Sequence, residues 1–184
     1  MKSLHAAAGC LGLLLTVTSA RAQSAPEPEQ APTRSPRLTL YSQSAALVYL
    51  SDARTTGGVG GGLGLRATFQ ERFFVQAELH YLLGIGNTAA LRLGAGVQRR
   101  GTYTPAVLLS LSALAGDGLT FLTPQHPTPV KSPAVSLGVS VAPLRFSSGG
   151  LHVSALELGV GVGTDLPGTG LALQLGLLEV GTSF

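Results

Sequence analysis

Apolar and polar residues alternate along most of the chain from Arg37 onward. A period of two predicts β-strands with one apolar face and one polar face. We identify eight such segments, at 38–50, 59–69, 73–81, 89–97, 103–113, 135–141, 151–162 and 171–180. In the last two segments the apolar parity reverses once. A β-bulge near Ala155 would explain the reversal in the seventh, because one extra residue exchanges the two faces of a strand.

These eight segments indicate a closed sheet rather than a set of helices. Charged residues make up only 11% of the chain, yet after the N-terminal region no stretch has 18 consecutive apolar residues. Spanning helices are therefore excluded, and a bilayer otherwise admits only closed barrels. An even number of strands also returns the chain to its starting side. We predict an all-β fold over residues 37–184, an eight-stranded antiparallel up-and-down transmembrane β-barrel.

The N-terminal residues 1–22 have the pattern of a secretory signal peptide. Lys2 and His5 precede an apolar stretch, and Ala20-Arg21-Ala22 offers a cleavage site after Ala22. About 12 apolar residues are too few for a spanning helix. Cys10 would suit a lipoprotein only if it followed the apolar core, and it lies inside that core. Cleavage leaves a mature chain without cysteine and with nearly balanced charge, so we expect no nucleic acid partner.

Residues 23–36 are predicted to form a Pro-rich periplasmic linker. Pro26, Pro28, Pro32 and Pro36 are mixed with small polar residues, which favours an extended polyproline conformation over a sheet. A Pro-rich motif that binds a partner is the alternative.

The lengths of the connections predict the orientation of the barrel. Those after the even strands are short and centre on 70–72, 99–101 and 146–149, whereas those after the odd strands are longer, at 51–57, 84–88, 116–131 and 164–169. Short turns of bacterial barrels face the periplasm. The longest connection, 116–131, could carry recognition or fold back over the barrel mouth.

Aromatic residues gather on the outward faces at the end with the short turns. Phe69, Phe73, Tyr103 and Phe184 all fall there, and we predict an aromatic girdle at this depth. Tyr81 would belong to the opposite girdle.

The final segment places Leu178, Val180 and Phe184 on one face. A Phe that ends an amphipathic strand resembles the C-terminal assembly signal of bacterial outer-membrane β-barrel proteins. Over residues 37–184 the pattern is similar to small eight-stranded barrels of the OmpA, OmpX and OmpW type. The resemblance implies an outer-membrane location, and it implies outer-membrane lipid, lipopolysaccharide and the barrel-assembly machinery as partners. We expect a monomer.

The predicted lumen contains charges at few positions. Pairing Phe69 with Phe73 sets Arg66 opposite Gln76, and we expect Glu78 to lie between Arg66 and Arg92. Such a charge cluster would brace the interior through charge-assisted hydrogen bonds. A polar lining for water or ions is the alternative. Inward glycines at 58, 60, 62 and 64 leave space that Tyr41 and Tyr49 of the preceding strand could fill.

A catalytic site is the least favoured hypothesis. His152-Val153-Ser154, with Glu157 or Glu179, could form a Ser/His/Glu arrangement. It resembles the site of outer-membrane lipid A deacylases, although Ala155-Leu156 replaces the usual Asn-Ala and His152 lies near the wrong end.

We therefore expect no enzyme, no catalytic residues and no cofactor, and no metal site, since His80 near Glu78 lacks a third ligand. The function classes that remain are a non-enzymatic outer-membrane protein with an envelope-structural or surface-interaction role, and a narrow channel or carrier for small or apolar solutes.

Overall fold

The computed structural model describes residues 35–184 apart from 53, 117–132 and 166–167, and this part of the chain consists of β-strands and their connections. The strands are β1 Arg37–Ser51, β2 Thr55–Phe69, β3 Phe73–Gln98, β4 Ala106–Gly116, β5 Ala134–Ala142, β6 Arg145–Ser148, β7 Leu151–Ser154, β8 Glu157–Thr164 and β9 Thr169–Ser183. No helix within the described residues is long and apolar enough to cross a membrane. The predicted signal peptide, nearly all of the predicted linker and the connection 117–131 lie outside the described residues.

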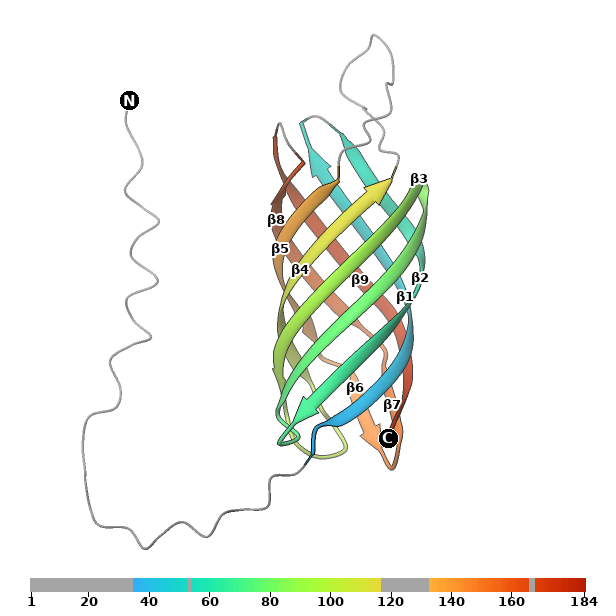
Figure 1. Ribbon diagram of the computed structural model, residues 1–184, viewed down its shortest axis with the longest axis vertical. Helices are drawn as coiled ribbons and strands as arrows, with labels where there is room; N and C mark the ends of the chain where they lie inside the picture. Colours follow the sequence, from blue (N-terminus) through green and yellow to red (C-terminus); the bar gives the residue numbers. More distant parts are fainter. Residues whose placement is uncertain (1–34, 53, 117–132, 166–167) are drawn as a thin grey trace, which may run out of the picture. The chain divides into compact units, whose positions relative to one another are not determined.

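The strands close into an antiparallel barrel of eight crossings (Figure 1), which confirms the predicted fold class. β3 supplies two crossings, because its residues 73–85 pair with β2 and its residues 88–98 pair with β4. Gly84 and Gly86 have positive φ angles of 132° and 78° where the strand reverses, a conformation that glycine adopts without a steric penalty. β5 with β6, and β7 with β8, each form one interrupted crossing. β1 pairs with β9 and closes the circle.

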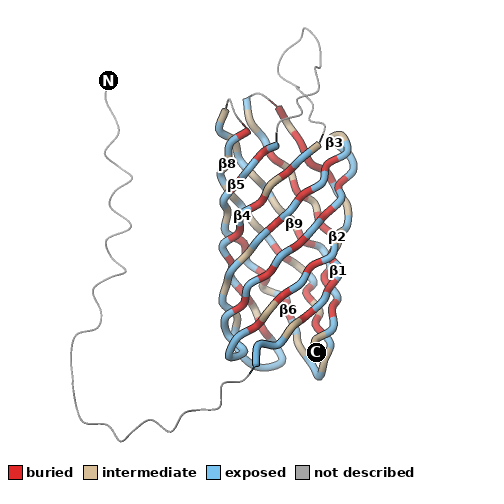
Figure 2. Tube along the Cα trace, viewed as in Figure 1, coloured by how far each residue is buried: buried red, intermediate tan, exposed pale blue. Residues whose placement is uncertain are grey.

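Buried and exposed residues alternate along the strands, as Figure 2 shows by the change of colour at successive positions. The exposed members are mostly large and apolar. In β2, for example, Val59 and Leu63 are 59% and 65% exposed, whereas Arg66 is 2% exposed. The barrel is therefore apolar outside and charged inside, the inverse of a soluble domain.

Inward glycines make room for large side chains from neighbouring strands. A Cβ atom added at Gly64 would lie 2.2 Å from Cζ of Tyr41, and one added at Gly170 would lie 2.6 Å from Cζ of Tyr49. Tyr41 therefore fills the space beside a β2 glycine, as predicted. Tyr49 fills the space beside a glycine of β9, which lies on the other side of β1.

Three neighbouring crossings exchange their inward and outward faces at the same level. The inward residues change from even to odd numbers between Ala142 and Arg145, between Ser154 and Glu157, and, in β9, between Gly176 and Glu179. We call this level the parity break. Ser154 pairs with Glu179 and Glu157 pairs with Gly176, so β7, β8 and β9 stay in register across it. The extra residue of β9 is instead accommodated in its pairing with β1, where the register shifts between Ser44 and Ala45.

The parity changes predicted in the seventh and eighth strands are confirmed, but their form differs from a single bulge near Ala155. Residues 155–156 separate β7 from β8, and residues 143–144 separate β5 from β6. Pro143 has no backbone N–H and cannot take a full part in a ladder. Across the gap, the N–H of Ala155 donates to the carbonyl of Leu144 at 2.9 Å.

Two expectations about strand limits were wrong. Tyr103 lies before β4, which starts at Ala106, and forms only an isolated bridge with Phe146. Pro105 has no backbone N–H, so the hydrogen-bond ladder of β4 does not extend back to Tyr103. The connection after β1 covers only residues 52–54, shorter than the predicted 51–57. The contrast between short and long connections is consequently smaller than the sequence pattern indicated.

Candidate functional site

Among the described residues, the interior of the barrel holds eight charged side chains, each no more than 2% exposed. They are Arg54, Arg66, Glu78, Arg92, Arg145, Glu157, Asp165 and Glu179. Four arginines thus face four carboxylates. Because an isolated buried charge is very costly, this balance makes the interior the first candidate for a functional site.

Glu78, on the first arm of β3, accepts hydrogen bonds through both carboxylate oxygens. Its Oε1 accepts from the Tyr41 hydroxyl and from Nε2 of Gln76, both at 2.7 Å. Its Oε2 accepts from Nη1 of Arg92 at 2.9 Å and lies 3.2 Å from Nε2 of His80. The predicted contact between Glu78 and Arg92 is thus present in the structure.

Arg66 bonds to a different carboxylate from the one that sequence spacing indicated. Its Nη1 and Nη2 donate to the two oxygens of Glu179 at 2.8 and 2.9 Å, a bidentate pair. Its Nε donates to Oε1 of Gln76 at 3.0 Å, and Cζ lies 4.6 Å from the centre of the Tyr41 ring, so Gln76 and Tyr41 link Arg66 to Glu78. The register that sets Arg66 opposite Gln76 is as predicted.

These contacts join into a closed circuit that crosses the lumen. Arg92 donates from Nη2 to Oε1 of Glu157 and, at 2.7 Å, to the hydroxyl of Ser140. Nη2 of Arg145 lies 4.0 Å from Oε2 of Glu157 and 3.6 Å from Oε2 of Glu179. We call the set the lumen ring, and its members are Arg66, Gln76, Glu78, Arg92, Glu157, Arg145 and Glu179. Positive and negative charges alternate around it.

Arg145 is the weakest member of the lumen ring. None of its three guanidinium nitrogens has a hydrogen-bond partner among the described residues. Its Cζ lies 5.4 Å from the centre of the Phe74 ring, and Cζ of Arg66 lies at the same distance from that ring. Such cation–π contacts partly replace the missing hydrogen bonds. The hydroxyls of Thr104 and Ser154 are also buried without partners in this part of the chain.

Apolar side chains fill other parts of the lumen. One buried cluster contains Leu47, Tyr49, Leu82, Ala90, Leu114 and Ala134, and another contains Phe74, Ala106, Leu108 and Ala142. A void of about 20 Å³ lies beside Gly138, Gly159 and Gly161, which is room for about one water molecule. The ring and the apolar clusters together obstruct the described interior.

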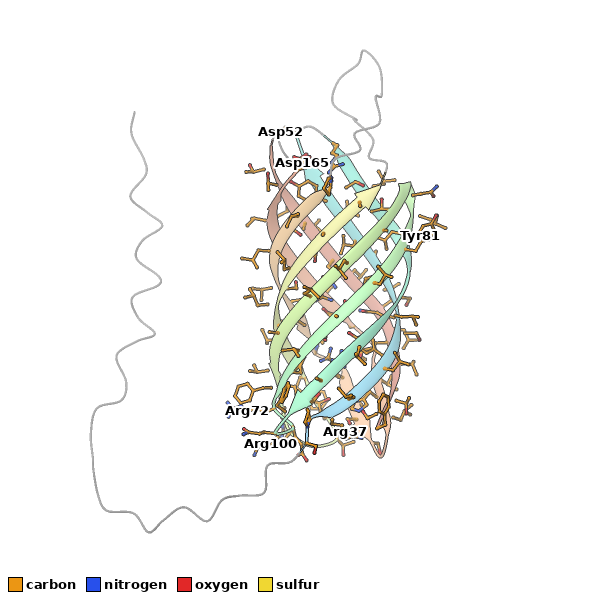
Figure 3. All side chains as sticks on the ribbon, viewed as in Figure 1. Arg37, Asp52, Arg72, Tyr81, Arg100 and Asp165 are labelled. Atoms are coloured by element: carbon orange, nitrogen blue, oxygen red, sulfur yellow. The ribbon has the colours of Figure 1, made fainter. Side chains whose placement is uncertain are left out.

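An ion pair outside the lumen ring lies toward the end of the barrel where Figure 3 labels Asp52 and Asp165. Nε of Arg54 donates to Oδ2 of Asp165 at 3.3 Å, and the Ser51 hydroxyl donates to the same oxygen at 2.8 Å. This pair links the β1–β2 connection to the β8–β9 connection and fastens two loops together.

The residues of the least favoured, catalytic hypothesis do not form a triad in the structure. His152 and Ser154 both point inward on β7, but Nε2 of His152 bonds to the hydroxyl of Ser183, which in turn bonds to that of Thr39 at 2.7 Å. The hydroxyl of Ser154 has no partner among the described residues. No group of three or more potential metal ligands occurs in that part of the chain either.

The aromatic residues singled out in the sequence lie at one end of the exterior. Phe69 and Phe73 face each other across the tight turn and are 42% and 47% exposed, and Tyr103 is 41% exposed. Sequence reasoning missed Phe146, whose ring centre lies 5.4 Å from that of Tyr103. Phe184 exchanges two backbone hydrogen bonds with Leu38, at 3.0 and 3.3 Å, and so joins the two ends of the sheet.

The predicted charge cluster did not include three members of the lumen ring, Arg145, Glu157 and Glu179, and the two glutamates were considered only as partners of His152. Arg145 precedes a Ser-Ser-Gly stretch that reads as a turn. Glu157 and Glu179 each follow directly after a parity change, on the polar face. A charge beside a parity change was therefore the available signal for both glutamates.

Three solved structures illustrate what this chain is similar to. Ail of Yersinia pestis, the attachment invasion locus protein, in complex with the heparin analogue sucrose octasulfate, is 14% identical; the match covers 82% of this chain and 99% of that chain, with a TM-score of 0.46. The N-terminal β-barrel domain of Pseudomonas aeruginosa OprF is 13% identical, with 80% of this chain and 97% of that chain covered and a TM-score of 0.47. Neisserial surface protein A is 11% identical, with 80% and 97% of the two chains covered and a TM-score of 0.48. All are small eight-stranded outer-membrane β-barrels. No protein-family model and no curated protein matches the chain. The likeness concerns the fold alone.

Proposed function

We propose that this protein is a non-enzymatic barrel of the bacterial outer membrane with an envelope-structural or surface-interaction role. The observation that carries the proposal is the inside-out distribution of side chains, with large apolar residues exposed around the wall and eight charged residues buried within it. A closed sheet satisfies its backbone groups internally, as a lipid environment requires. Outer-membrane lipid surrounds the apolar wall in this proposal.

The lumen ring suits a structural role because it connects strands that are not neighbours in the sheet. Arg66 of β2 reaches Glu179 of β9 across β1, and Arg92 of β3 reaches Glu157 of β8 across the lumen. Side chains that link strands that are not neighbours resist flattening of the barrel. The same links obstruct solute passage, which favours a structural or surface role over transport.

Assembly by the barrel-assembly machinery belongs to the same proposal. Phe184 is 74% exposed at the end of β9, so its ring is accessible to a receptor. We expect Phe184→Ala to reduce the folded protein that is recovered from outer membranes, with normal export. Heat-modifiable mobility in gel electrophoresis measures the folded fraction. Wild-type amounts of the folded variant would contradict the assignment of Phe184 as the assembly signal.

Flotation of membranes and labelling of single cysteines test the location and the orientation. Cysteines at positions 125 and 148 should label oppositely, with position 125 reached by an impermeant reagent on whole cells, because the short-turn end is expected to face the periplasm. Surface labelling at Ser148 alone would reverse the orientation. Recovery of the chain in the soluble fraction would contradict the membrane proposal itself.

A narrow channel is the second candidate, and the unpartnered groups around Arg145 favour it. Buried polar groups without protein partners are commonly hydrated, and Arg145, Thr104 and Ser154 form such a group within the described lumen. Single-channel recording of the reconstituted protein distinguishes the candidates. Discrete conductance that rises in Leu82→Ala, which opens one apolar cluster, would favour the channel.

We assign no catalytic role to His152 and Ser154, since His152 bonds to Ser183 instead. Lipid A from cells that express the protein should keep all its acyl chains. A loss of acyl chains that depends on His152 would make this protein an enzyme and overturn the proposal.

A further inference from the structure

The charges that are exposed in the described part of the chain lie almost entirely at one end of the barrel. Arg37, Arg72 and Arg100 occupy the end opposite Asp52 and Asp165 (Figure 3), and Arg99 precedes Arg100 in the same connection. All four arginines are exposed, and Glu71 is the exposed acidic side chain among them. We call these four arginines the basic collar. The interior charges balance one another, so the collar carries the excess positive charge of the described residues.

The arginines of the basic collar form no ion pair with an acidic side chain in the described part of the chain. Their contacts are with backbone carbonyls and a ring. Nε of Arg100 donates to the carbonyl of Gln70 at 3.1 Å, and Nη2 of Arg37 donates to that of Gly149. Cζ of Arg72 lies 5.6 Å from the centre of the Phe73 ring. The contacts to Gln70 and Gly149 orient two of the guanidinium groups and leave their positive charge unneutralised.

The collar borders the exposed aromatic side chains of the same end. Phe73 belongs to the predicted girdle and contacts Arg72, and Phe69 is joined to Arg72 by the turn hydrogen bond from the Arg72 N–H to the Phe69 carbonyl at 3.1 Å. Aromatic rings prefer the membrane–water interface. If these rings lie at that depth, the guanidinium groups lie level with lipid headgroups.

We propose that the basic collar binds the phosphate groups of anionic glycerophospholipids in the leaflet at the short-turn end. The inference rests on the proposed membrane function and adds the lipid class that this end selects. Arginine pairs with phosphate through several N–H donors at once. A zwitterionic headgroup offers the same phosphate but carries a compensating cation, so charge complementarity favours the anionic lipid.

The test measures lipid selectivity of the full chain reconstituted in phosphatidylcholine vesicles. Spin-labelled phosphatidylglycerol and spin-labelled phosphatidylcholine are compared by the fraction of each that the protein immobilises. We expect phosphatidylglycerol to be preferred by about five-fold for each occupied arginine, which corresponds to the attraction of about 1 kcal/mol per basic residue at an anionic surface. High salt should reduce the preference, because these charges are exposed to solvent.

Variants separate charge from structure. Replacing all four collar arginines with glutamine should abolish the preference, whereas replacing all four with lysine should retain most of it. Asp52→Asn, at the opposite end, is the matched control and should leave the preference unchanged. Heat-modifiable mobility verifies that each variant is folded, and the salt dependence of the wild-type protein tests the proposal without any variant.

Three results would overturn the inference. They are equal immobilisation of both lipids by the wild type at low salt, an undiminished preference in the folded glutamine variant, and preferential retention of lipid A over phosphatidylglycerol in mixed vesicles. The absence of any immobilised lipid would be a different failure. It would show that the chain does not enter the bilayer, and it would overturn the proposed function together with this inference.

Discussion

Two sides of the barrel, one formed by β1 to β3 and the other by β5 to β9, differ in the regularity of their strand pairing. From β1 to β3 the register is continuous, and the pairing of β2 with β3 runs without a shift from Phe69 and Phe73 to Gly57 and Ile85. From β5 to β9 the parity break interrupts three crossings and moves the mismatch to the β1–β9 pair. On the first, regular side, residues of the same parity face the lumen along the whole of each crossing. On the second side, the parity of the inward residues changes at the parity break.

This difference determines where the charges of the lumen ring come from. The regular side contributes Arg66, Glu78 and Arg92, which the period of two already directed inward. The other side contributes Arg145, Glu157 and Glu179, each directly after the parity break in the direction of the residue numbers. A shift of one residue therefore turns these three charges toward the lumen, where they balance those of the regular side.

The largest effect is expected from Glu179→Ala, on the irregular side. Among the described residues, Arg66 would lose its one carboxylate contact, and Arg145 would keep Glu157 at 4.0 Å as its one acidic neighbour. Breaking a buried pair while one charge remains costs about 3–5 kcal/mol of unfolding free energy. Urea unfolding in lipid vesicles measures it. The exposed Asp52→Ala is the control and should change stability by less than about 0.5 kcal/mol. Equal stabilities of these two variants would show that the ring does not brace the barrel.

On the regular side, Glu78→Ala should cost less, about 2–3 kcal/mol, as expected for lost hydrogen bonds to a charged group. Arg92 keeps Glu157 and Ser140 as partners, and Gln76 keeps Arg66. The same unfolding measurement applies. If Glu78→Ala proves more damaging than Glu179→Ala, then the division of the ring between the two sides is incorrect.

Two glycines of β2 provide a third test. Gly64→Ala would place a methyl group against the Tyr41 ring, which the Glu78 hydrogen bond holds in place. Such overpacking costs about 1–3 kcal/mol. Gly61→Ala, on the outward face of the same strand, has only the Gln43 carbonyl nearby, at 3.6 Å, and should be neutral. Comparing unfolding midpoints checks the pair. Similar losses in both variants would mean that strand propensity, rather than lumen space, determines these glycines.

The smallest effect concerns the turn between β2 and β3. Gln70 and Glu71 have φ angles of 53° and 59°, the left-handed region that a type I′ turn requires and that Asn-Gly adopts best. Replacing them with Asn-Gly should raise stability by about 0.5–1 kcal/mol. Replacement with Ala-Ala should bring no gain. A gain in both variants would attribute the effect to side-chain removal rather than to backbone conformation.

The regular side could be predicted from the sequence almost completely. A tight turn between Phe69 and Phe73 gave the register, and the register gave the inward positions of Arg66, Gln76 and Glu78. The partner of Arg66 could not be predicted in the same way, because Glu179 is separated from it by 113 residues and by a parity change. Periodicity reports which face a residue occupies, but it carries no information about which distant strand lies opposite.

The pairing of β1 with β9 also concerns the order of events during folding. The hydroxyls of Thr39 and Ser183 meet although 144 residues separate them along the chain, and such distant contacts carry the largest loop-closure entropy. Until β9 is in place, β1 presents an open edge that a strand of another molecule can occupy. The time between synthesis of β1 and arrival of β9 is therefore the interval in which this protein is most exposed to aggregation.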